Sequence, residues 1–347
     1  MSPAPTTRSV ANPTRRGLLA AGGAAGLGVL LAACGSGEGS GTAASNDSSG
    51  GSWELTDDRG TKVKLASRPT RLVTYIGVAA ALHDFGVDEQ IVGVFGPSKL
   101  KDGKPDALAG GFDVSKATVV GNVYGQFDLE KYASLRPELL VTHTYQNNAL
   151  WYVPDASKDK IAKLAPSFAI KVSNVLLPEA IGRHQELAAA LGADLKATKV
   201  TDAKKRFDAA AERIRKTAKA RKGITVMASS AAAATLYVSS PKPYADLNWL
   251  TSLGVDFIRP DNVQGGFFEN LSWEKADKYR ADVILLDNRT GTLQPKDLTG
   301  KPTWQRLPAV KADQVVPWPS EARFSWAGCA PTLERIADAL ESAKKVA

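Results

Sequence analysis

The chain has 347 residues, of which 44% are apolar and 23% are charged, a composition typical of a soluble globular protein. At about 150 residues per domain, this length predicts roughly two domains, each large enough to bury a core. The 44 basic and 36 acidic residues give a net charge of +8. The most basic stretch, residues 204–222, also contains Asp208 and Glu212, so we interpret it as a solvated helix face and set nucleic-acid binding aside.

Residues 1–33 have the features of an export signal. Arg15 and Arg16, within Thr-Arg-Arg-Gly-Leu-Leu, resemble a twin-arginine export sequence. The apolar run that follows is short and weak against the roughly 20 residues of a spanning helix. Leu-Ala-Ala-Cys at 31–34 resembles a lipobox, in which Cys34 becomes the acylated first residue. We therefore expect an exported protein whose attachment to the outer face of the cell membrane is a lipid on Cys34.

Residues 34–52 are predicted to form a flexible tether after the lipidated cysteine. Positions 35–52 contain six Gly and six Ser, too little apolar surface to pack. With Cys34 lipidated, Cys329 has no disulfide partner and is predicted to be a buried, inert thiol.

Beyond residue 53 the sequence alternates between strand and helix patterns. A hairpin is predicted at 53–55 and 62–65. Further strands are predicted at 71–76, 91–95, 118–120, 139–141, 168–172, 224–227, 236–238, 283–286 and 315–316. Helices are predicted up to residue 85, from residue 129, near 158–164, near 247–253 and at 331–345. Such alternation is typical of βαβ units around a parallel sheet.

A long helical stretch interrupts this alternation. From Val200 to Ala218, apolar positions recur at spacings of three and four, and Gly223 ends the helix after a basic last turn. The predicted fold is therefore α/β, with two Rossmann-like lobes whose sheets are mainly parallel, joined by a single long rigid helix. We place the first lobe at 53–177, the helical connector at 178–222 and the second lobe at 223–347.

The two predicted lobes also share a local sequence pattern. Residues 127–141 and 271–285 match without a gap at an offset of 144 residues, so that Glu130 corresponds to Glu274. Both segments carry a helix pattern followed by an apolar strand. We interpret this match as a duplicated lobe plan.

These features together resemble the siderophore and cobalamin type of substrate-binding protein that serves bacterial ABC importers. The resemblance extends over about residues 53–345 and is carried by 71–74, 127–141, 271–286 and 303–317, with the lipobox and tether. It implies two α/β lobes on one long helix, with a ferric siderophore or cobalamin bound between them. It also implies a monomer that needs no cofactor and delivers its ligand to ABC permease subunits, with transport energy from a separate ATPase.

The predicted ligand site lies where strands end. Ligands of open parallel sheets bind beyond the carboxyl ends of the strands, so the residues that follow the strands of both lobes should face one interlobe cleft. Aromatic faces and Arg donors suit a bulky chelate with an apolar skeleton and an oxygen-rich iron centre. The predicted ligand residues are Tyr124, Tyr145, Trp151, Tyr237, Phe267, Phe268, Arg289, Trp318, Arg323 and Trp326.

The resemblance adds roles for some of these positions. Tyr145 matches a Tyr that contacts the chelate in hydroxamate-siderophore binders, and Phe267 or Phe268 falls near a stacking aromatic. The hydroxamate class is therefore favoured, although the Arg expected after Val-Gly is replaced by Asn122-Val123-Tyr124. Glu130 and Glu274 match acidic residues that dock onto the two permease subunits.

Two other ligand classes and one other class of protein are alternatives to a siderophore receptor. Cobalamin or haem would suit the same fold, and so would zinc or manganese, although only His83, His143 and His184 are present and His143 alone follows a strand. An enzyme would need a nucleophile-elbow, phosphate-loop or zincin motif, or a dinucleotide fingerprint after the first strand, and we find none. We therefore predict a binding protein that catalyses nothing.

Overall fold

The structure is a computed structural model that describes residues 51–347. The predicted export signal, the lipobox with Cys34 and most of the tether lie outside the described residues. The described residues belong to one compact unit. None of their helices is both long enough and apolar enough to cross a membrane.

The first lobe is built on a sheet of five parallel strands in the order β5-β4-β3-β6-β7. The predicted hairpin, β1 and β2, precedes it. The bounds are β1 (Trp53–Thr56), β2 (Lys62–Leu65), β3 (Leu72–Tyr75), β4 (Ile91–Phe95), β5 (Thr118–Gly121), β6 (Leu139–Thr144) and β7 (Ser167–Lys171). The strand order reverses between β3 and β6, the point at which open parallel sheets bind ligands.

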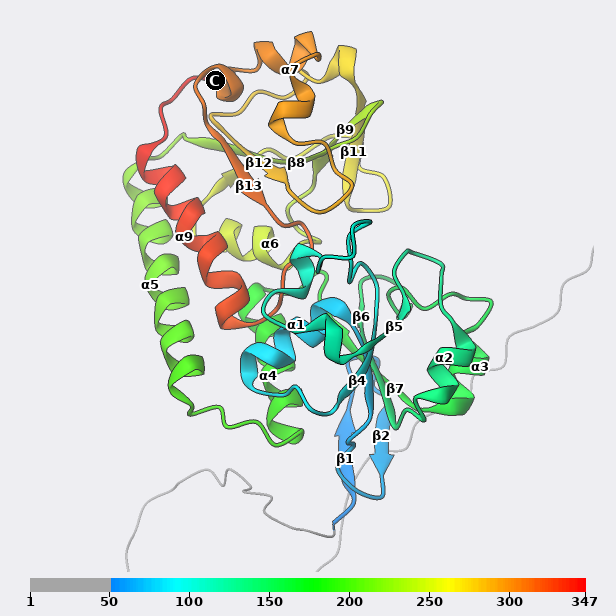
Figure 1. Cartoon of the computed structure of the whole chain (residues 1–347). Helices are drawn as coiled ribbons and strands as arrows, with labels where there is room; N and C mark the ends of the chain where they lie inside the picture. Colours follow the sequence, from blue (N-terminus) through cyan, green and yellow to red (C-terminus); the bar gives the residue numbers. More distant parts are fainter. Residues whose placement is uncertain (1–50) are drawn as a thin grey trace, which may run out of the picture. The chain divides into compact units, whose positions relative to one another are not determined.

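The helices of the first lobe form two pairs, α1 with α4 and α2 with α3. These pairs lie on opposite sides of the sheet (Figure 1). The helices are α1 (Ile76–Phe85), η1 (Ala107–Ala109), η2 (Val114–Lys116), α2 (Leu129–Ser134), α3 (Lys158–Leu164) and α4 (Leu177–Ala190). Because helices cover both faces, the central strands β3 and β6 are buried along their whole length.

The second lobe is built on a mixed sheet in the order β11-β9-β8-β12-β13, with β10 also paired to β8. Strands β8, β10, β12 and β13 are parallel to one another, whereas β9 pairs antiparallel with both β8 and β11. The strands are β8 (Thr225–Ala231), β9 (Thr235–Ser239), β10 (Asp256–Phe257), β11 (Phe268–Ser272), β12 (Val283–Asp287) and β13 (Val315–Trp318). The helices are α6 (Ala245–Ser252), η3 (Trp273–Lys275), η4 (Pro295–Leu298), α7 (Pro302–Arg306) and α8 (Pro308–Lys311).

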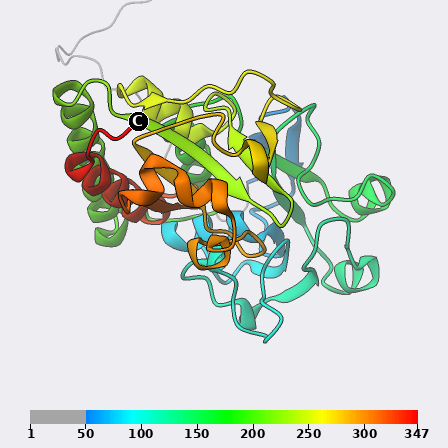
Figure 2. The same cartoon turned by 90° about the horizontal axis from the view of Figure 1, so that it is seen from above.

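The long helix α5 (Thr198–Ala220) runs beside α9 (Trp326–Ser342). Figures 1 and 2 show the two helices side by side, α5 in green and α9 in red. The 23 residues of α5 span about 34 Å. Three rings fix this arrangement, and we call them the spine cluster: Phe207 stacks on Trp249 at 5.0 Å and meets the edge of Trp326 at 4.9 Å.

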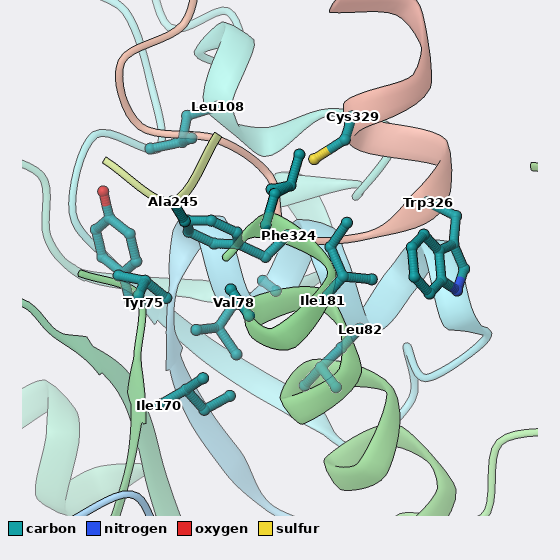
Figure 3. Packing of buried hydrophobic residues seen from close by; sticks show 14 of the residues in the cluster. Tyr75, Val78, Leu82, Leu108, Ile170, Ile181, Ala245, Phe324, Trp326 and Cys329 are labelled. Atoms are coloured by element: carbon teal, nitrogen blue, oxygen red, sulfur yellow. The ribbon is translucent and has the colours of Figure 1, made fainter. Parts of the chain in front are cut away.

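A continuous apolar core underlies the two lobes and includes residues from both sheets. Figure 3 shows part of this core, with Val78, Ile181 and Phe324 between Tyr75 on one side and Trp326 on the other. The Tyr75 hydroxyl points away from the apolar side chains. The ring of Tyr75 is therefore part of the core, and its hydroxyl donates to the Glu321 carboxylate.

The α/β class, the mainly parallel sheets and the long helix are confirmed. The predicted connector, residues 178–222, contains most of α4 and the long helix α5. The last helix starts at residue 326, five residues before its predicted start, because the Ser325 side chain caps it by accepting from the amide of Gly328 at 2.8 Å. In the repeated segment, the helix before β12 is the single 3₁₀ turn η3, whereas α2 precedes β6.

Candidate functional site

Six of the ten predicted ligand residues line one cavity of about 800 Å³. Its walls come from the segment after β6, the residues before and at the start of β11, and the residues that follow β12 and β13. The cavity therefore lies beyond the carboxyl ends of the strands, where the sequence predicts the ligand site. The six residues are Tyr124, Tyr145, Trp151, Phe267, Phe268 and Arg289.

Four of these rings, which we call the cleft aromatics, form an apolar wall. Trp151 lies with its ring centroid 4.8 Å from that of Tyr145 and 5.5 Å from that of Tyr124. Phe267, contributed by the second lobe, lies 6.4 Å from Tyr145. Tyr124 is 65% exposed, so the wall is open to solvent on its side. Such rings can stack on an extended apolar ligand.

Two tyrosines supply hydroxyl donors to the cavity. The Tyr145 hydroxyl is buried and has no hydrogen-bond partner among the described residues. Burial, followed by the negative charge of Glu321, raises the pKa of Tyr145 well above its ordinary value. Burial likewise raises the pKa of Tyr244 to about 12. Both phenols are therefore protonated at neutral pH and can donate to a ligand oxygen.

A cluster of three charges forms the floor of the cavity. Arg289 Nη2 and Nε lie 2.9 and 3.1 Å from Asp287 Oδ2, and Arg289 Nη1 donates to Glu321 Oε1. Burial alone would lower the pKa of Arg289, but the charges of Asp287 and Glu321 raise it above its ordinary value. Of the five guanidinium N–H groups, two have no partner among the described residues. Arg289 can therefore donate to a ligand although its charge is compensated.

Asp287 is fixed from several directions. Its side chain is fully buried, and its Oδ2 accepts from Ser230 Oγ at 2.8 Å and from Ser320 Oγ at 3.0 Å. The Asp287 carbonyl also accepts from Thr292 Oγ1 at 2.8 Å. These bonds hold the end of β12 and so determine where Arg289 points.

Glu321 links the floor of the second lobe to the first lobe. Its Oε2 accepts from the Tyr75 hydroxyl at the end of β3 and from Trp151 Nε1 at 3.3 Å. Only 9% of the Glu321 side chain is exposed. One buried carboxylate therefore bonds to donors of both lobes at the strand reversal of the first sheet.

Every cation that lines the cavity has a carboxylate partner. Arg59 Nε lies 2.6 Å from Asp57 Oδ2, and Lys158 Nζ lies 3.4 Å from Asp155 Oδ1. Arg289 is paired as described above. The lining also contains a further acid, Asp159. The cavity therefore presents hydrogen-bond donors without a net positive charge.

One contact crosses the mouth of the cavity. Gln146 Nε2, after β6, donates to the carbonyl of Gly265, in the loop before β11. Both residues are exposed. This bond brings the first-lobe and second-lobe rims together beside the cleft aromatics.

Four predicted ligand residues do not line this cavity. Tyr237, on β9, is half-buried, and its ring centroid lies 5.1 Å from that of Phe268. Trp318 is fully buried, where its Nε1 donates to Asp246 Oδ2 at 2.6 Å. The expectation that these two side chains line the cleft is corrected here, because the ring of Trp318 is enclosed in the core and Tyr237 packs against Phe268 without reaching the cavity lining.

The other two are Trp326 and Arg323. Trp326 belongs to the spine cluster, and its Nε1 donates to Gln185 Oε1 at 2.8 Å. Arg323 lines a smaller cavity of about 190 Å³ that shares Arg289 and Glu321 with the main cavity and is also lined by Cys329. The Cys329 thiol is buried, as predicted, and burial raises its pKa above the ordinary value. The expectation that Trp326 lines the cleft is therefore also corrected, whereas Arg323 lines the adjoining cavity between the lobes and not the main one.

His83 and His184 lie on helices, and His143 lies within β6, which extends three residues beyond the strand predicted at 139–141. Because His184 Nδ1 lies 2.8 Å from the Ala180 carbonyl, it carries the proton, and His143 Nε2 donates to His184 Nε2 at 3.0 Å. Burial lowers the pKa of His143 well below its ordinary value and that of His184 to about 4, so the pair is neutral. Residues 51–347 contain no group of three or more His, Cys, Asp or Glu that could hold a metal ion.

Glu130 and Glu274 are both exposed. Glu130 lies in the first turn of α2, after the Asp128 cap, and Glu274 lies in the 3₁₀ turn η3. Each therefore lies in the last helix or turn before a central strand of its own lobe, β6 or β12. Neither side chain lines the cavity.

Sequence reasoning missed two residues that line the cavity, Tyr244 and Glu321, and also Tyr75, which bonds to Glu321. Tyr75 is the last residue of a buried strand at the sheet's reversal point, and this position was a usable signal. Glu321 and Tyr244 lie in irregular segments with no pattern that marks them. Only the three-dimensional contacts bring these two side chains to the cavity.

Residues 73–322 match the family model described as periplasmic binding protein. Among solved structures, the chain is 51% identical to DesE, a ferric-siderophore receptor protein from Streptomyces coelicolor, with a TM-score of 0.82 and coverage of 85% of this chain and 100% of that one. The petrobactin-binding protein YclQ from Bacillus subtilis shares the fold at 18% identity, with a TM-score of 0.64 and coverage of 84% and 99%. Staphylococcus aureus SirA, complexed with staphyloferrin B, does so at 19% identity, with a TM-score of 0.58 and the same coverage. A comparison with curated protein sequences finds no match.

Proposed function

Because the chain belongs to the periplasmic binding protein family, we propose that it is an extracytoplasmic receptor, not an enzyme, that captures a ferric siderophore and delivers it to an ABC permease. The observation that carries this proposal is the cavity of about 800 Å³ with its wall of cleft aromatics. A cavity of this size suits a whole chelate. The 51% identity to a ferric-siderophore receptor supports the same ligand class.

The charges of the cavity favour a tris-hydroxamate chelate. Three hydroxamates neutralise one ferric ion, whereas three catecholates leave the complex with a charge of −3. Each cation of the lining already has a carboxylate partner, so a strongly anionic chelate would find no uncompensated positive charge. The tyrosine hydroxyls and the two remaining N–H groups of Arg289 suit the oxygen atoms of a neutral complex.

We assign the chelate contacts to the predicted residues that line the cavity and to two that the sequence did not indicate. The rings of Tyr124, Trp151, Phe267 and Phe268 would stack on the skeleton, while Tyr145, Tyr244 and Arg289 would donate to oxygen. Glu321 would hold Arg289 in place.

The receptor would be held at the membrane by a lipid on Cys34 and would dock through Glu130 and Glu274. The two acids occupy corresponding positions of the repeated segment and are exposed outside the cavity, as a pair of docking contacts requires. The permease subunits would each receive one acid, and a separate ATPase would supply the energy.

Tryptophan fluorescence of the purified protein tests the ligand. The titration uses ferric tris-hydroxamate, ferric tris-catecholate, cobalamin, haem and zinc, with the iron-free hydroxamate as the control. We expect saturable quenching at submicromolar concentration by the ferric hydroxamate and none by its iron-free form. Saturation by zinc, cobalamin or haem alone would replace the proposed ligand.

Charge reversal tests the docking residues separately. In cells that express the importer, the double substitution Glu130→Lys and Glu274→Lys should abolish uptake of the radioactive ferric chelate. The purified double variant should keep the affinity of the wild-type protein, because neither side chain lines the cavity. Normal uptake in cells with the double variant, or loss of chelate affinity in the purified variant, would contradict the docking assignment.

A further inference from the structure

We propose that Glu321 determines the charge selectivity of the cleft, because it compensates Arg289 and so favours neutral and cationic ferric chelates over anionic ones. This inference rests on the proposed function, since it concerns which chelates the cavity accepts. It assigns a role to a residue that lies outside every predicted ligand position. The role follows from three properties of Glu321: its partners, its burial and its place in the charge cluster.

The partners of Glu321 differ for its two oxygen atoms. Oε1 accepts from Arg289 Nη1, whereas Oε2 accepts from the Tyr75 hydroxyl and from Trp151 Nε1 at 3.3 Å. The two donors at Oε2 are neutral. The charge of the carboxylate is therefore directed at the one cation of the floor, and the remaining bonds need an oxygen acceptor but no charge.

Burial makes this charge effective. The Glu321 side chain is 9% exposed and that of Asp287 is 0% exposed, whereas Arg289 is 37% exposed and faces the cavity. Water screens such buried carboxylates weakly, so their field reaches a ligand bound above the guanidinium. With two carboxylates and one guanidinium, the floor carries a net charge of −1.

The two carboxylates of the floor are not equivalent. Asp287 also bonds to Ser230, Ser320 and the backbone amide of Arg289, so its removal would disturb the end of β12. Glu321 holds no backbone amide among the described residues, and an amide oxygen could replace its Oε2. Glu321→Gln therefore changes the net charge of the floor from −1 to 0 while it keeps the volume and two of the three donors.

The consequence for ligands is a graded preference. At an effective dielectric constant of about 20, a unit charge roughly 8–10 Å from the floor interacts strongly enough to change affinity roughly tenfold. The wild-type cleft should therefore bind a cationic chelate more tightly than an anionic chelate of the same shape. Loss of the Glu321 charge should weaken this preference.

A series of three ligands that share one skeleton and differ in charge tests the inference. A linear tris-hydroxamate with a terminal amine is used as such, acetylated, or succinylated, and each is loaded with Fe³⁺. The three complexes carry charges of +1, 0 and −1 on the same iron centre. Their dissociation constants are measured by tryptophan quenching for the wild-type protein and for Glu321→Gln.

We expect the wild-type affinity to fall by about tenfold for each unit of charge, and so by about a hundredfold from the amine to the succinylated complex. In Glu321→Gln this ratio should shrink at least threefold. The matched control is Tyr75→Phe, which removes a hydrogen bond to the same carboxylate but leaves its charge. Whatever its absolute affinity, Tyr75→Phe should keep the wild-type ratio between the three ligands, which separates charge from the loss of a contact.

The outcomes distinguish this inference from the proposed function. If the wild-type protein binds none of the three complexes, the proposed function fails. If it binds all three equally, or the succinylated complex most tightly, the charge selectivity is overturned, and this result does not depend on whether any variant folds. If the ratio is unchanged in a folded Glu321→Gln protein, the role of Glu321 is overturned.

Discussion

The spine cluster and the cleft aromatics use the same kinds of ring for opposite purposes. Phe207 is 2% exposed and lies against Trp249 and Trp326, while Trp326 donates its N–H to Gln185. Phe267, in contrast, is half-buried against the open cavity. Rings that are covered on all sides contribute to folding, whereas rings with one open face remain available to a ligand.

The largest expected effect is on stability, from Phe207→Ala in the spine cluster. Truncation of a fully packed phenylalanine leaves a cavity and should lower the free energy of unfolding by about 3–5 kcal/mol. Chemical denaturation followed by circular dichroism measures this change. At a temperature where the variant is still folded, its affinity for the ferric chelate should stay within about twofold of wild type. If Phe207→Ala were as stable as the wild-type protein but bound the chelate more weakly, Phe207 would contribute to ligand binding and not to folding.

The second effect concerns Trp318, a ring predicted for the cleft and found in the core. Its N–H donates to Asp246, and burial raises the pKa of this carboxyl to about 6. Because the folded pKa exceeds the unfolded value of 3.8, the folded state binds the proton more tightly. Stability is therefore fully present below pH 3.8 and is lost as pH rises through about 6. The loss amounts to about 3 kcal/mol at most.

Asp246→Asn removes this titration and keeps an oxygen acceptor for Trp318. Its thermal midpoint, measured against wild type from pH 4 to pH 7, should show an advantage that grows as the pH rises. An advantage that is constant over this range would show that Asp246 does not carry the shifted pKa. Chelate affinity should not follow the same curve, because neither residue lines the main cavity.

Phe267→Ala is the counterpart of Phe207→Ala on the cleft side. Phe267 lies 5.6 Å from Tyr244 and 6.4 Å from Tyr145, with its remaining face toward the cavity. Loss of this ring should raise the dissociation constant of the ferric chelate about tenfold, or about 1.4 kcal/mol. The thermal midpoint should change much less than in Phe207→Ala. Calorimetric titration and a melting curve on the same sample give both values.

Phe267→Leu serves as the control for this pair. Leucine keeps much of the apolar surface but removes the flat face, so it should recover only part of the lost affinity. If Phe267→Ala instead unfolds the protein, the distinction between the two aromatic regions fails at this position.

The sequence predicted the fold more completely than the site. Strand and helix patterns depend on neighbours along the chain, so β4 and α3 were predicted with the bounds that the structure gives. The site depends on which rings are left with an open face, and the sequence does not contain that information. Trp151 and Trp326 both follow a β-strand, yet only Trp151 reaches the cavity.

Charge compensation is the other feature that sequence could not supply. Arg289 was predicted as a ligand donor, and it does line the cavity. Its partner Glu321 is 32 residues away and lies in no periodic segment. The net charge of the floor, and with it the proposed selectivity, therefore depends on a contact within the folded second lobe that no sequence pattern marks.

The smallest expected effect comes from the ion pairs on the outside of the spine. Arg213 Nη2 lies 2.6 Å from both Asp338 and Glu341, and so ties α5 to α9. These groups are exposed, and such pairs are screened by salt and contribute little. Arg213→Gln should therefore shift the thermal midpoint by no more than about 2 °C, and the shift should vanish in 1 M salt. A shift as large as that of Phe207→Ala would mean that charge, and not the spine cluster, holds the two helices together.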